Sequence, residues 1–335
     1  MTVETLNIPG ISKPASRIGL GTWAIGGWMW GGSDESEAVR TIQAAVEQGI
    51  NLIDTAPVYG FGKSEKIVGQ ALAGGLRERA LIATKVALNW RSGKPYRDAG
   101  ARRINHEIED SLRRLRTDHI DLYQVHWPDP LTPIEETASA LAALKKQGKV
   151  LAIGVSNFSP AQMDAFRAVA PLVSVQPPYN LFERGIDQDV LPYAEAGGLM
   201  TLCYGALCRG LLSGRITGET EFSGDDLRRI DPKFQEPRRS QYLAAVAELD
   251  AYARERHGKS VLTLAVRWVL DRGRTIALWG ARREEQLKGM QEVFGWKLTT
   301  DDMREIDAIV ARHVHDPIGP EFMAPPTKDK VLGTV

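Results

Sequence analysis

The chain has 335 residues, of which 43% are hydrophobic and 25% are charged, and its 42 basic residues balance 42 acidic ones. Such a composition is typical of a soluble globular protein with a large core, and it excludes a disordered chain. A net charge of zero argues against nucleic acid or an anionic membrane as the partner. We therefore expect a small molecule as the main partner, and a monomer or weak homo-oligomer as the state of the protein.

The N-terminus and the cysteine content predict a cytoplasmic protein. The first residues, MTVETLNIPGISKP, contain no basic segment followed by an apolar run, and nowhere do eighteen apolar residues occur in a row. The chain contains two cysteines, Cys203 and Cys208, which are too few for a disulfide framework or a four-ligand zinc site. We therefore expect neither export nor a membrane span, and no bound metal.

The elements predicted along the chain begin with a β-hairpin over residues 6–18, which turns at Pro9-Gly10. From residue 17 onward, short apolar runs alternate with amphipathic segments of helix length, a pattern that indicates βαβ units. The eight strands predicted are Arg17–Gly21, Asn51–Asp54, Leu81–Lys85, Asp121–His126, Ala152–Val155, Val173–Gln176, Met200–Tyr204 and Thr275–Trp279. The helices predicted between them are Glu35–Gln48, Ser64–Leu72, Ile104–Leu115, Ile134–Gln147 and Ala161–Val169.

The last third of the chain adds a long loop and further helices. The segment Ser213–Ser240 is polar and rich in Gly and Pro, which predicts a long loop after the seventh strand. Helices are predicted at Ser260–Leu270, Glu284–Glu292 and Asp301–His313. Eight βα units predict a (β/α)8 TIM barrel with extra C-terminal helices, formed by residues 1–335 as one domain. An open doubly wound sheet is disfavoured because no G-x-G-x-x-G fingerprint follows any strand.

Four reactive side chains follow successive predicted strands. Asp54, Lys85 and His126 each end a strand, and Tyr59 follows Asp54 in the same loop. Because the carboxyl ends of barrel strands meet at one face, these side chains are expected to converge there. A lysine ammonium stabilises a phenolate, so we expect Lys85 to lower the pKa of Tyr59, while Asp54 holds Lys85 in its charged form. His126 would bind a carbonyl oxygen or share the proton.

Other interpretations of these residues stay open. A single polar residue at a strand end is more often structural than catalytic, although four at consecutive strand ends favour catalysis. A metal-dependent hydrolase with Asp54, His126 and Asp129 as ligands is a rival, but the chain lacks paired histidine spacing to complete a metal site. The remaining histidines are interpreted as solvated side chains: His106, His119, His257, His313 and His315.

At this point the sequence resembles the aldo-keto reductase family, whose catalytic tetrad of Asp, Tyr, Lys and His matches Asp54, Tyr59, Lys85 and His126. The resemblance covers nearly the whole chain and includes the strings Gly19–Trp23, Asp54–Gly60, Gly154–Phe158 and Gln176–Asn180. The strings around Trp28, around Asp129 and over Tyr204–Leu212 are most similar to bacterial members of the glycerol dehydrogenase or glyceraldehyde reductase type. The resemblance implies an NADP(H)-dependent oxidoreductase that interconverts carbonyls and alcohols, with Tyr59 as the general acid.

The resemblance also implies where the cofactor binds. Ser156, Asn157 and Gln176 would bind the nicotinamide carboxamide, and Tyr204 would stack on the ring, although an aromatic residue at a strand end often only packs. The backbone of residues 205–211 would line the pyrophosphate. Arg282 at the start of the predicted helix would bind a 2′-phosphate, or else belong to a solvated helix start. The full set is Thr22, Trp23, Asp54, Ser156, Asn157, Gln176, Tyr204, Gly205, Ala206, Leu207, Arg209, Gly210, Leu211, Gly280, Ala281, Arg282 and Gln286.

The substrate side is predicted to be aromatic. Trp23 and Trp30 on the first loop, with Trp90 and Trp127 on later loops, would form a wall beside Tyr59 and His126 that accepts small hydroxylated aldehydes such as glyceraldehyde. Trp28 and Trp30 have the alternative of only packing the loop. A non-catalytic cofactor-binding regulatory subunit is a second rival function, since some family members regulate partner proteins.

Overall fold

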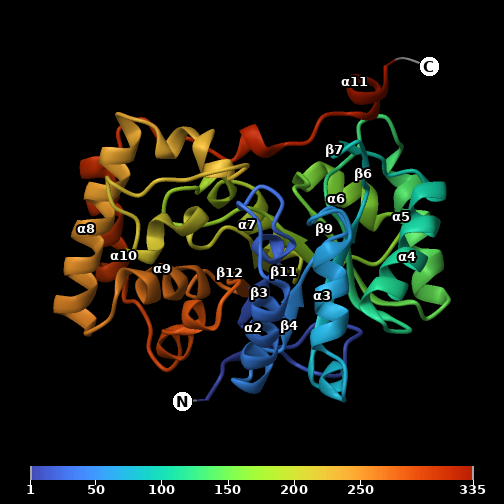
Figure 1. The fold of residues 1–335 in the computed structure, drawn as a ribbon, viewed down its shortest axis with the longest axis horizontal. Coiled ribbons are helices and arrows are strands. Elements are labelled where there is room, and N and C mark those ends of the chain that lie inside the picture. The colour runs from blue at the N-terminus through green and yellow to red at the C-terminus, as the bar shows by residue number, and fades with distance from the viewer. Residues whose placement is uncertain (1, 334–335) are drawn as a thin grey trace.

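Eight parallel strands form a closed barrel at the centre of the computed structural model, which describes residues 2–333 (Figure 1). This arrangement confirms the predicted (β/α)8 barrel. The strands pair with their neighbours around the barrel in the order β10 (Ser174–Gln176), β11 (Met200–Cys203), β12 (Thr275–Gly280), β3 (Ile18–Gly21), β4 (Leu52–Asp54), β5 (Leu81–Val86), β8 (Ile120–Val125) and β9 (Val150–Ser156).

Helices surround the barrel and bury one face against it, as their apolar spacing predicts. Between strands and helices lies the large core, and a smaller core of Leu, Ile, Ala and Met side chains fills the barrel interior. Among residues 2–333 no helix combines the length and apolar character needed to cross a membrane. The helices are α1 (Trp23–Gly26), α2 (Glu35–Glu47), α3 (Lys63–Ala71), α4 (Ala101–Leu115), α5 (Ile134–Lys146), α6 (Pro160–Arg167), α7 (Val190–Ala196), α8 (Arg238–His257), α9 (Val261–Leu270), α10 (Thr300–His313) and α11 (Lys328–Leu332).

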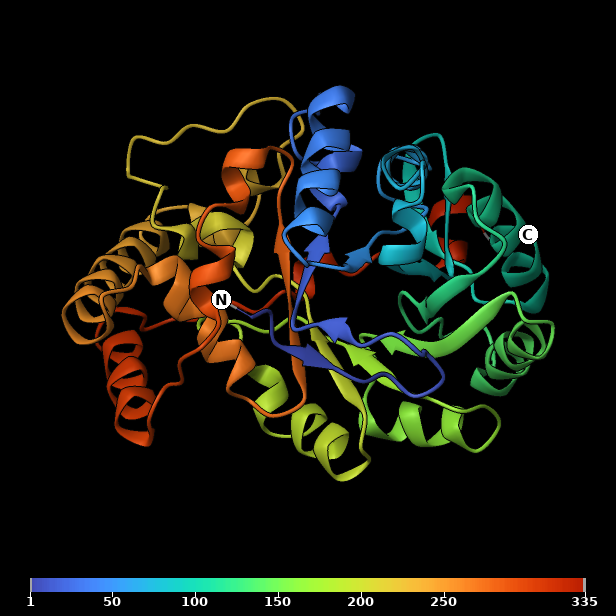
Figure 2. The ribbon, with the colours of Figure 1, turned by 90° about the horizontal axis from the view of Figure 1, so that it is seen from below.

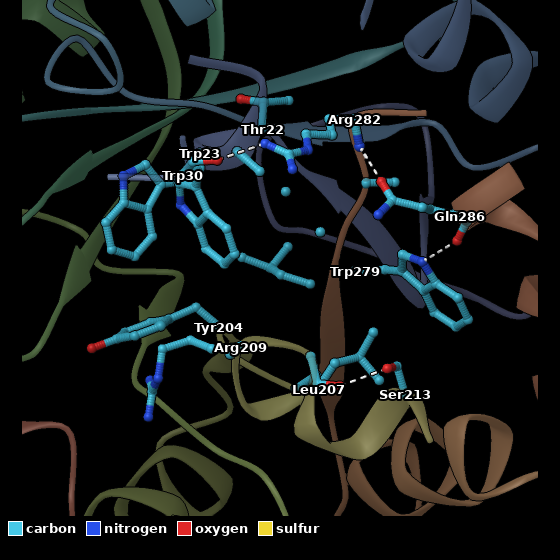
Figure 3. Close-up of a pocket in the computed structure, with 18 of the residues that line it drawn as sticks. Thr22, Trp23, Trp30, Tyr204, Leu207, Arg209, Ser213, Trp279, Arg282 and Gln286 are labelled. Carbon is cyan, nitrogen blue, oxygen red and sulfur yellow. Dashed lines mark hydrogen bonds between the residues drawn. The ribbon is translucent and has the colours of Figure 1, made fainter. Parts of the chain in front are cut away.

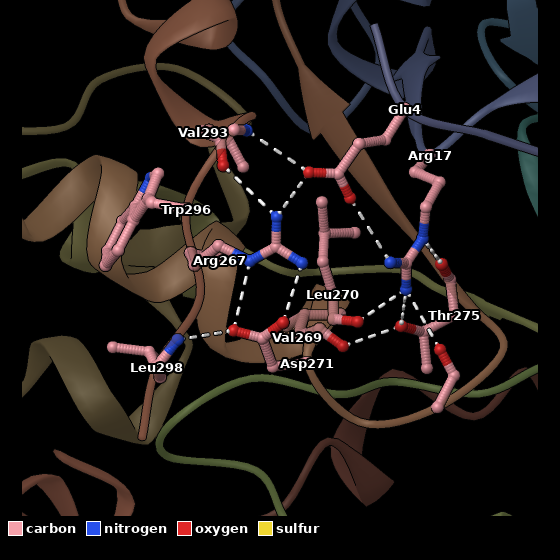
Figure 4. A network of polar contacts seen from close by, with 12 residues as sticks. Glu4, Arg17, Arg267, Val269, Leu270, Asp271, Thr275, Val293, Trp296 and Leu298 are labelled. Carbon is pink, nitrogen blue, oxygen red and sulfur yellow. Dashed lines mark hydrogen bonds and ion pairs between the residues drawn. The ribbon is translucent and has the colours of Figure 1, made fainter.

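The N-terminal hairpin lies across the bottom of the barrel, as predicted (Figure 2). Its strands β1 (Thr5–Leu6) and β2 (Ala15–Ser16) pair antiparallel. A network of polar contacts connects the hairpin to α9 and β12 (Figure 4). Arg267, fully buried on α9, donates to Glu4 at 2.8 Å and pairs with Asp271 at 2.7 Å, while Arg17 donates to the Thr275 carbonyl at 3.1 Å. These contacts lie below the place where β12 pairs with β3.

Three segments cover the opposite, top face of the barrel. The first is a hairpin of β6 (Leu88–Arg91) and β7 (Lys94–Arg97), which the sequence did not predict. The second is the predicted loop after β11, which contains the short turns η4 (Leu227–Arg229) and η5 (Pro232–Phe234). The third is the C-terminal segment, which crosses the top face from α10 to the hairpin (Figure 1). It is held there by Arg97, whose backbone N–H donates to the Pro326 carbonyl at 3.0 Å.

Two predictions of the sequence are wrong in detail. The helix expected over residues 284–292 is replaced by two 3-10 turns, η6 (Glu284–Leu287) and η7 (Met290–Val293), because Gly289 between them has a φ of 92°. Not all remaining histidines are solvated either. His257 packs against Trp296 and lies 3.0 Å from the Asp302 carboxylate, since the end of α8 turns it toward α10.

Candidate active site

Asp54, Tyr59, Lys85 and His126 meet at the top of the barrel. Asp54 is the last residue of β4, Lys85 lies at the end of β5, and His126 directly follows β8. The Lys85 ammonium donates to the Asp54 carboxylate at 2.7 Å and to the Tyr59 hydroxyl at 3.2 Å. The rings of Tyr59 and His126 lie edge to face with centroids 5.8 Å apart. The sequence therefore predicted correctly which side chains the barrel brings together.

The electrostatic environment of these groups differs in one respect from the expectation. Burial, together with the charge of Asp54, raises the pKa of Tyr59 well above its ordinary value, whereas the sequence argument expected Lys85 to lower it. Burial likewise lowers the pKa of Lys85, and Asp54 opposes that shift. Burial and the nearby Lys85 charge lower the pKa of His126. At neutral pH the phenol is thus protonated and the imidazole is neutral, so each carries a proton that it can donate.

The loop that carries Tyr59 is fixed by a glycine contact. Gly26, at the end of α1, lies so close that a Cβ there would come within 2.6 Å of the Tyr59 carbonyl carbon and oxygen. On the other side of the contact, Gly60 has a φ of 67°, and a Cβ there would lie 2.3 Å from the Gly26 carbonyl oxygen. Only glycine allows this approach, which holds the Tyr59 loop against the first loop.

A cavity of about 320 Å³ extends from Asp54 and Tyr59 toward the ends of β11 and β12, and Lys85 and His126 are not among the residues that line it. Figure 3 shows the side chains around this cavity. At one end it is lined by Tyr59, Asp54, Trp23 and Trp30, and at the other by Arg282 and Gln286. Its floor includes Tyr204 and the backbone of Gly205 and Gly210, both of which have positive φ. Of the cofactor residues predicted from sequence, the cavity is lined by Thr22, Trp23, Asp54, Tyr204, Gly205, Ala206, Leu207, Arg209, Gly210, Gly280, Ala281, Arg282 and Gln286.

The remaining predicted cofactor side chains lie behind Tyr204 and Asp54. The Tyr204 hydroxyl donates to the Asn157 side-chain oxygen at 2.9 Å, and the Ser156 hydroxyl donates to the Gln176 carbonyl at 2.7 Å. The Gln176 amide donates to Asp54 at 2.8 Å. Leu211 is fully buried and is not among the cavity residues.

Arg282 joins the far end of the cavity to the first loop. Its guanidinium donates to the carbonyls of Trp30 and Gly32 at 2.7 and 2.9 Å, and its backbone N–H donates to Gln286 at 2.8 Å. Burial and the positive charges of Arg283 and Arg228 lower its pKa. The positive charges favour an anion at this end of the cavity. A 3-10 turn, η6, stands where the N-terminus of a helix was expected to contribute amide groups.

A scan against protein-family models matches residues 17–311 to the aldo/keto reductase family. The chain belongs to this family. The aldo-keto reductase YhdN of Bacillus subtilis is 57% identical over 98% of this chain and 100% of its own. The NADH-specific methylglyoxal reductase of Escherichia coli is 35% identical over 89% of this chain and 96% of its own.

Solved structures of other family members give the same barrel. The glycerol dehydrogenase AKR11B4 from Gluconobacter oxydans is 57% identical, with a TM-score of 0.88 over 97% of this chain and 100% of that one. An aldo/keto reductase from Klebsiella pneumoniae in complex with NADP and acetate is 26% identical, with a TM-score of 0.73 over 95% of this chain and 100% of that one. This confirms the resemblance to the glycerol dehydrogenase type.

Two cavity arginines of this aldo-keto reductase were not predicted from sequence. Arg215 and Arg228 lie on the loop after β11 and line the same cavity as Arg282. Arg228 also stacks on Trp30, with its guanidinium 5.1 Å from the ring centroid. Both arginines lie in the predicted loop Ser213–Ser240, so its basic residues were the available sign of a contact with an anion. Arg209, whose backbone was predicted as a cofactor contact, also lines the cavity, while its guanidinium forms buried ion pairs with Glu183 and Asp231.

The predicted aromatic wall is divided between the cavity and its surroundings. Trp23 stacks on Tyr59 with centroids 5.9 Å apart and meets Trp30 edge to face, and both tryptophans line the cavity. Trp90, which lies in the β6–β7 hairpin, packs on Phe61, and Trp127 packs under the Arg97 guanidinium. The last two are not among the cavity residues.

Proposed function

We propose that this aldo-keto reductase reduces small aldehydes and ketones with NADPH, or oxidises the corresponding alcohols, with Tyr59 as the general acid and base. The observation that carries the proposal is the position of the Tyr59 hydroxyl. It lies 3.2 Å from a fully buried ammonium, that of Lys85, and its residue lines the cavity. A protonated phenol in that position donates its proton to a carbonyl oxygen.

The residues around the cavity fit a dinucleotide. When bound, a reduced nicotinamide supplies the hydride that adds to the carbonyl carbon. Tyr204 offers a flat aromatic surface for such a ring, and Asn157, Ser156 and Gln176 lie behind it with amide and hydroxyl groups suited to a carboxamide. The backbone of residues 205–210 and the arginines at the far end suit the phosphates.

Within that site each tetrad residue has a separate task. Tyr59 transfers the proton, and neutral His126 binds the substrate oxygen and orients it toward Tyr59. Lys85 stabilises the phenolate that remains after proton transfer. Asp54 holds Lys85 and is itself held by Gln176, so the charge pair stays in one geometry.

The substrate class follows from the tryptophans and from the relatives. Trp23 and Trp30 line the cavity together with Tyr59, so an aromatic surface borders the space beside the proposed proton donor. One similar structure is a glycerol dehydrogenase and one relative is a methylglyoxal reductase. We infer a short hydroxylated or dicarbonyl compound such as glyceraldehyde as the substrate. We also infer a reducing compartment such as the cytoplasm, because Cys203 and Cys208 are both free thiols.

A metal-dependent hydrolase receives no support from the site. Within residues 2–333 no group of three His, Cys, Asp or Glu side chains is arranged to hold a metal ion. Asp129, the third ligand of that rival, instead accepts from the backbone N–H groups of Ala99 and Leu131 at 3.1 and 3.0 Å.

A single experiment tests the proposed activity. NADPH is titrated by fluorescence quenching, and its absorbance is then followed with DL-glyceraldehyde, with and without EDTA. We expect NADPH binding and EDTA-insensitive consumption of NADPH. Tight NADPH binding without turnover of any aldehyde would instead favour a regulatory subunit, and nucleotide-independent, EDTA-sensitive activity would favour a hydrolase.

The preference for NADPH over NADH is expected to depend on Arg282. Arg282→Ala should weaken NADPH binding by about 10- to 100-fold, the effect of losing charge-assisted hydrogen bonds to a phosphate. NADH, which lacks that phosphate, should lose much less. The measurement is the Kd of both cofactors by fluorescence titration.

The ratio of the two cofactor affinities separates this effect from loop loosening. Because Arg282 also binds the Trp30 and Gly32 carbonyls, its loss weakens the first loop for both cofactors alike. The matched control is Arg283→Ala, which removes a neighbouring exposed arginine that lies 3.5 Å from Glu37. Equal losses for NADPH and NADH in Arg282→Ala would show that Arg282 does not recognise the 2′-phosphate.

A further inference from the structure

Three buried hydroxyl groups form a chain beneath the loop that carries Asp54 and Tyr59. The Ser64 hydroxyl lies 2.7 Å from that of Thr22 and 2.9 Å from that of Thr55. All three side chains have an exposed fraction of 0%. They come from three different segments, the residue after β3, the residue after β4 and the start of α3. The chain of hydroxyls therefore joins the first two βα loops to one helix.

The single proton on each hydroxyl limits which of the three groups can donate these hydrogen bonds. Each hydroxyl has one proton to donate. Thr22 uses its proton on the Asp54 carbonyl, which lies 2.9 Å away. With that proton in use, Ser64 can donate to the Thr22 hydroxyl or to the Thr22 carbonyl at 3.1 Å, and Thr55 can donate to Ser64. Ser64 is the middle member of the chain, because its hydroxyl contacts both of the other two, and it is linked to the Asp54 backbone through Thr22.

The segment from residue 54 to 59 supplies three hydrogen-bond partners of the Lys85 ammonium. Besides the Asp54 carboxylate and the Tyr59 hydroxyl, Lys85 donates to the Thr55 carbonyl at 3.0 Å. The backbone N–H of Ser64 donates to the Tyr59 carbonyl at 3.1 Å. Ser64 thus holds both ends of the segment from residue 54 to 59, one through hydroxyl groups and the other through its amide.

Helix capping does not account for the Ser64 hydroxyl. Ser64 is the second residue of α3, and the residue that precedes the helix, Gly62, offers no side-chain cap. The hydroxyl contacts Thr22 and Thr55, which lie outside the helix, and it makes no bond to an amide of the first turn. Its contacts lead to the proposed catalytic loop.

We propose that Ser64 is a positioning residue, whose hydroxyl holds the 54–59 segment so that Lys85 reaches the Tyr59 hydroxyl. This inference rests on the proposed function, because it gives Ser64 a role only through Tyr59 and Lys85. Ser64 is fully buried and is not among the residues that line the cavity. Its loss should therefore change the proton-transfer step and leave cofactor binding in place.

The test is Ser64→Ala, measured as kcat and KM for DL-glyceraldehyde, as the Kd for NADPH, and as the pH dependence of alcohol oxidation. We expect kcat to fall about tenfold, the effect of one lost hydrogen bond on a barrier. The NADPH Kd should stay within about twofold. Oxidation, which needs the phenolate, should require a higher pH, because the ammonium would no longer be held at the phenol.

Two further variants keep the test decisive. Thr22→Val preserves shape while removing the hydroxyl that bonds the Asp54 carbonyl, so it should reproduce the fall in kcat even if Ser64→Ala folds poorly. Because Thr22 also lines the cavity, its NADPH Kd is measured as well and should stay within about twofold. Thr41→Val is the matched control, because its hydroxyl bonds a helix carbonyl, that of Glu37, at 2.8 Å on α2, away from the cavity. It should leave kcat unchanged.

The failure of this inference can be distinguished from the failure of the proposed function. Wild-type kcat in both Ser64→Ala and Thr22→Val, with Tyr59→Phe inactive, would overturn the positioning role alone. A parallel loss of kcat and NADPH affinity in Ser64→Ala would also overturn it, since that pattern indicates general loosening of the site. Retained reduction by Tyr59→Phe would overturn the proposed function itself.

Discussion

Tyr59→Phe is expected to lose about a thousandfold in kcat for glyceraldehyde reduction while binding NADPH with unchanged affinity. The substitution removes one oxygen, which is the atom that Lys85 contacts at 3.2 Å. General acid catalysis typically contributes about 10²- to 10⁴-fold to a rate. The stacking of the ring on Trp23 is retained, so the cavity keeps its shape. The measurement is steady-state kinetics together with NADPH titration.

The control for this variant is a tyrosine whose hydroxyl is bonded elsewhere. Tyr193 lies on α7, and its hydroxyl donates to Asp164 on α6, far from Tyr59 in the sequence. Tyr193→Phe should therefore keep wild-type kcat. If Tyr59→Phe retains more than about a tenth of the activity, another group donates the proton and the assignment to Tyr59 is wrong.

Lys85→Met is expected to lose both activity and stability. Removal of the ammonium leaves the Asp54 carboxylate buried beside a methionine, and breaking a buried ion pair in this way costs about 3–5 kcal/mol of unfolding free energy. The phenolate of Tyr59 also loses its stabilising charge. Burial and Asp54 already raise the pKa of Tyr59, so removal of the ammonium should raise it further. Residual alcohol oxidation, which needs the phenolate, should therefore begin only at a higher pH than in the wild type.

A double variant separates the two effects of Lys85. In Asp54→Asn/Lys85→Met no charge of the pair remains, so the thermal stability should recover toward that of the wild type while kcat stays low. The measurements are thermal unfolding and the pH profile of oxidation. Full activity in the double variant would show that the ion pair serves folding alone.

The sequence predicted the barrel and the meeting of its reactive side chains because both depend on local patterns. Apolar runs mark the strands, and the carboxyl ends of parallel barrel strands meet at the top face, where polar residues tend to be functional. Asp54, Lys85 and His126 were found in this way. Tyr59 was found because it follows Asp54 within a short loop.

The errors arose where a distant contact or one backbone angle decides the structure. Gly289 divides the expected helix into two turns through a positive φ that the sequence alone does not reveal. His257 was expected to be solvated, but it packs against Trp296 and its partner Asp302 lies 45 residues further along the chain, so its packing could not be read from its surroundings. The helix α8 was not predicted either, because its buried face includes the small side chains of Ala245 and Ala253 and its apolar stripe is therefore weak.

The pKa of Tyr59 shows a further limit of the sequence. The residue types that surround Tyr59 were predicted, but the direction of the shift depends on how fully the phenol is removed from water. Burial is the largest cause of the raised value. The charged residues near Tyr59 in the sequence therefore could not predict the direction of its pKa shift.

The two ends of the chain differ as sites for attachment to a solid support. The N-terminal hairpin lies below the barrel, whereas the C-terminal segment is fastened by Arg97 at the top face, where Met323 lines the cavity (Figure 1). A bead or fusion partner joined before β1 would leave the cavity open to solution. The same partner joined after α11 would pull on the segment that borders the cavity, so immobilisation through the N-terminus is the better choice for a working catalyst.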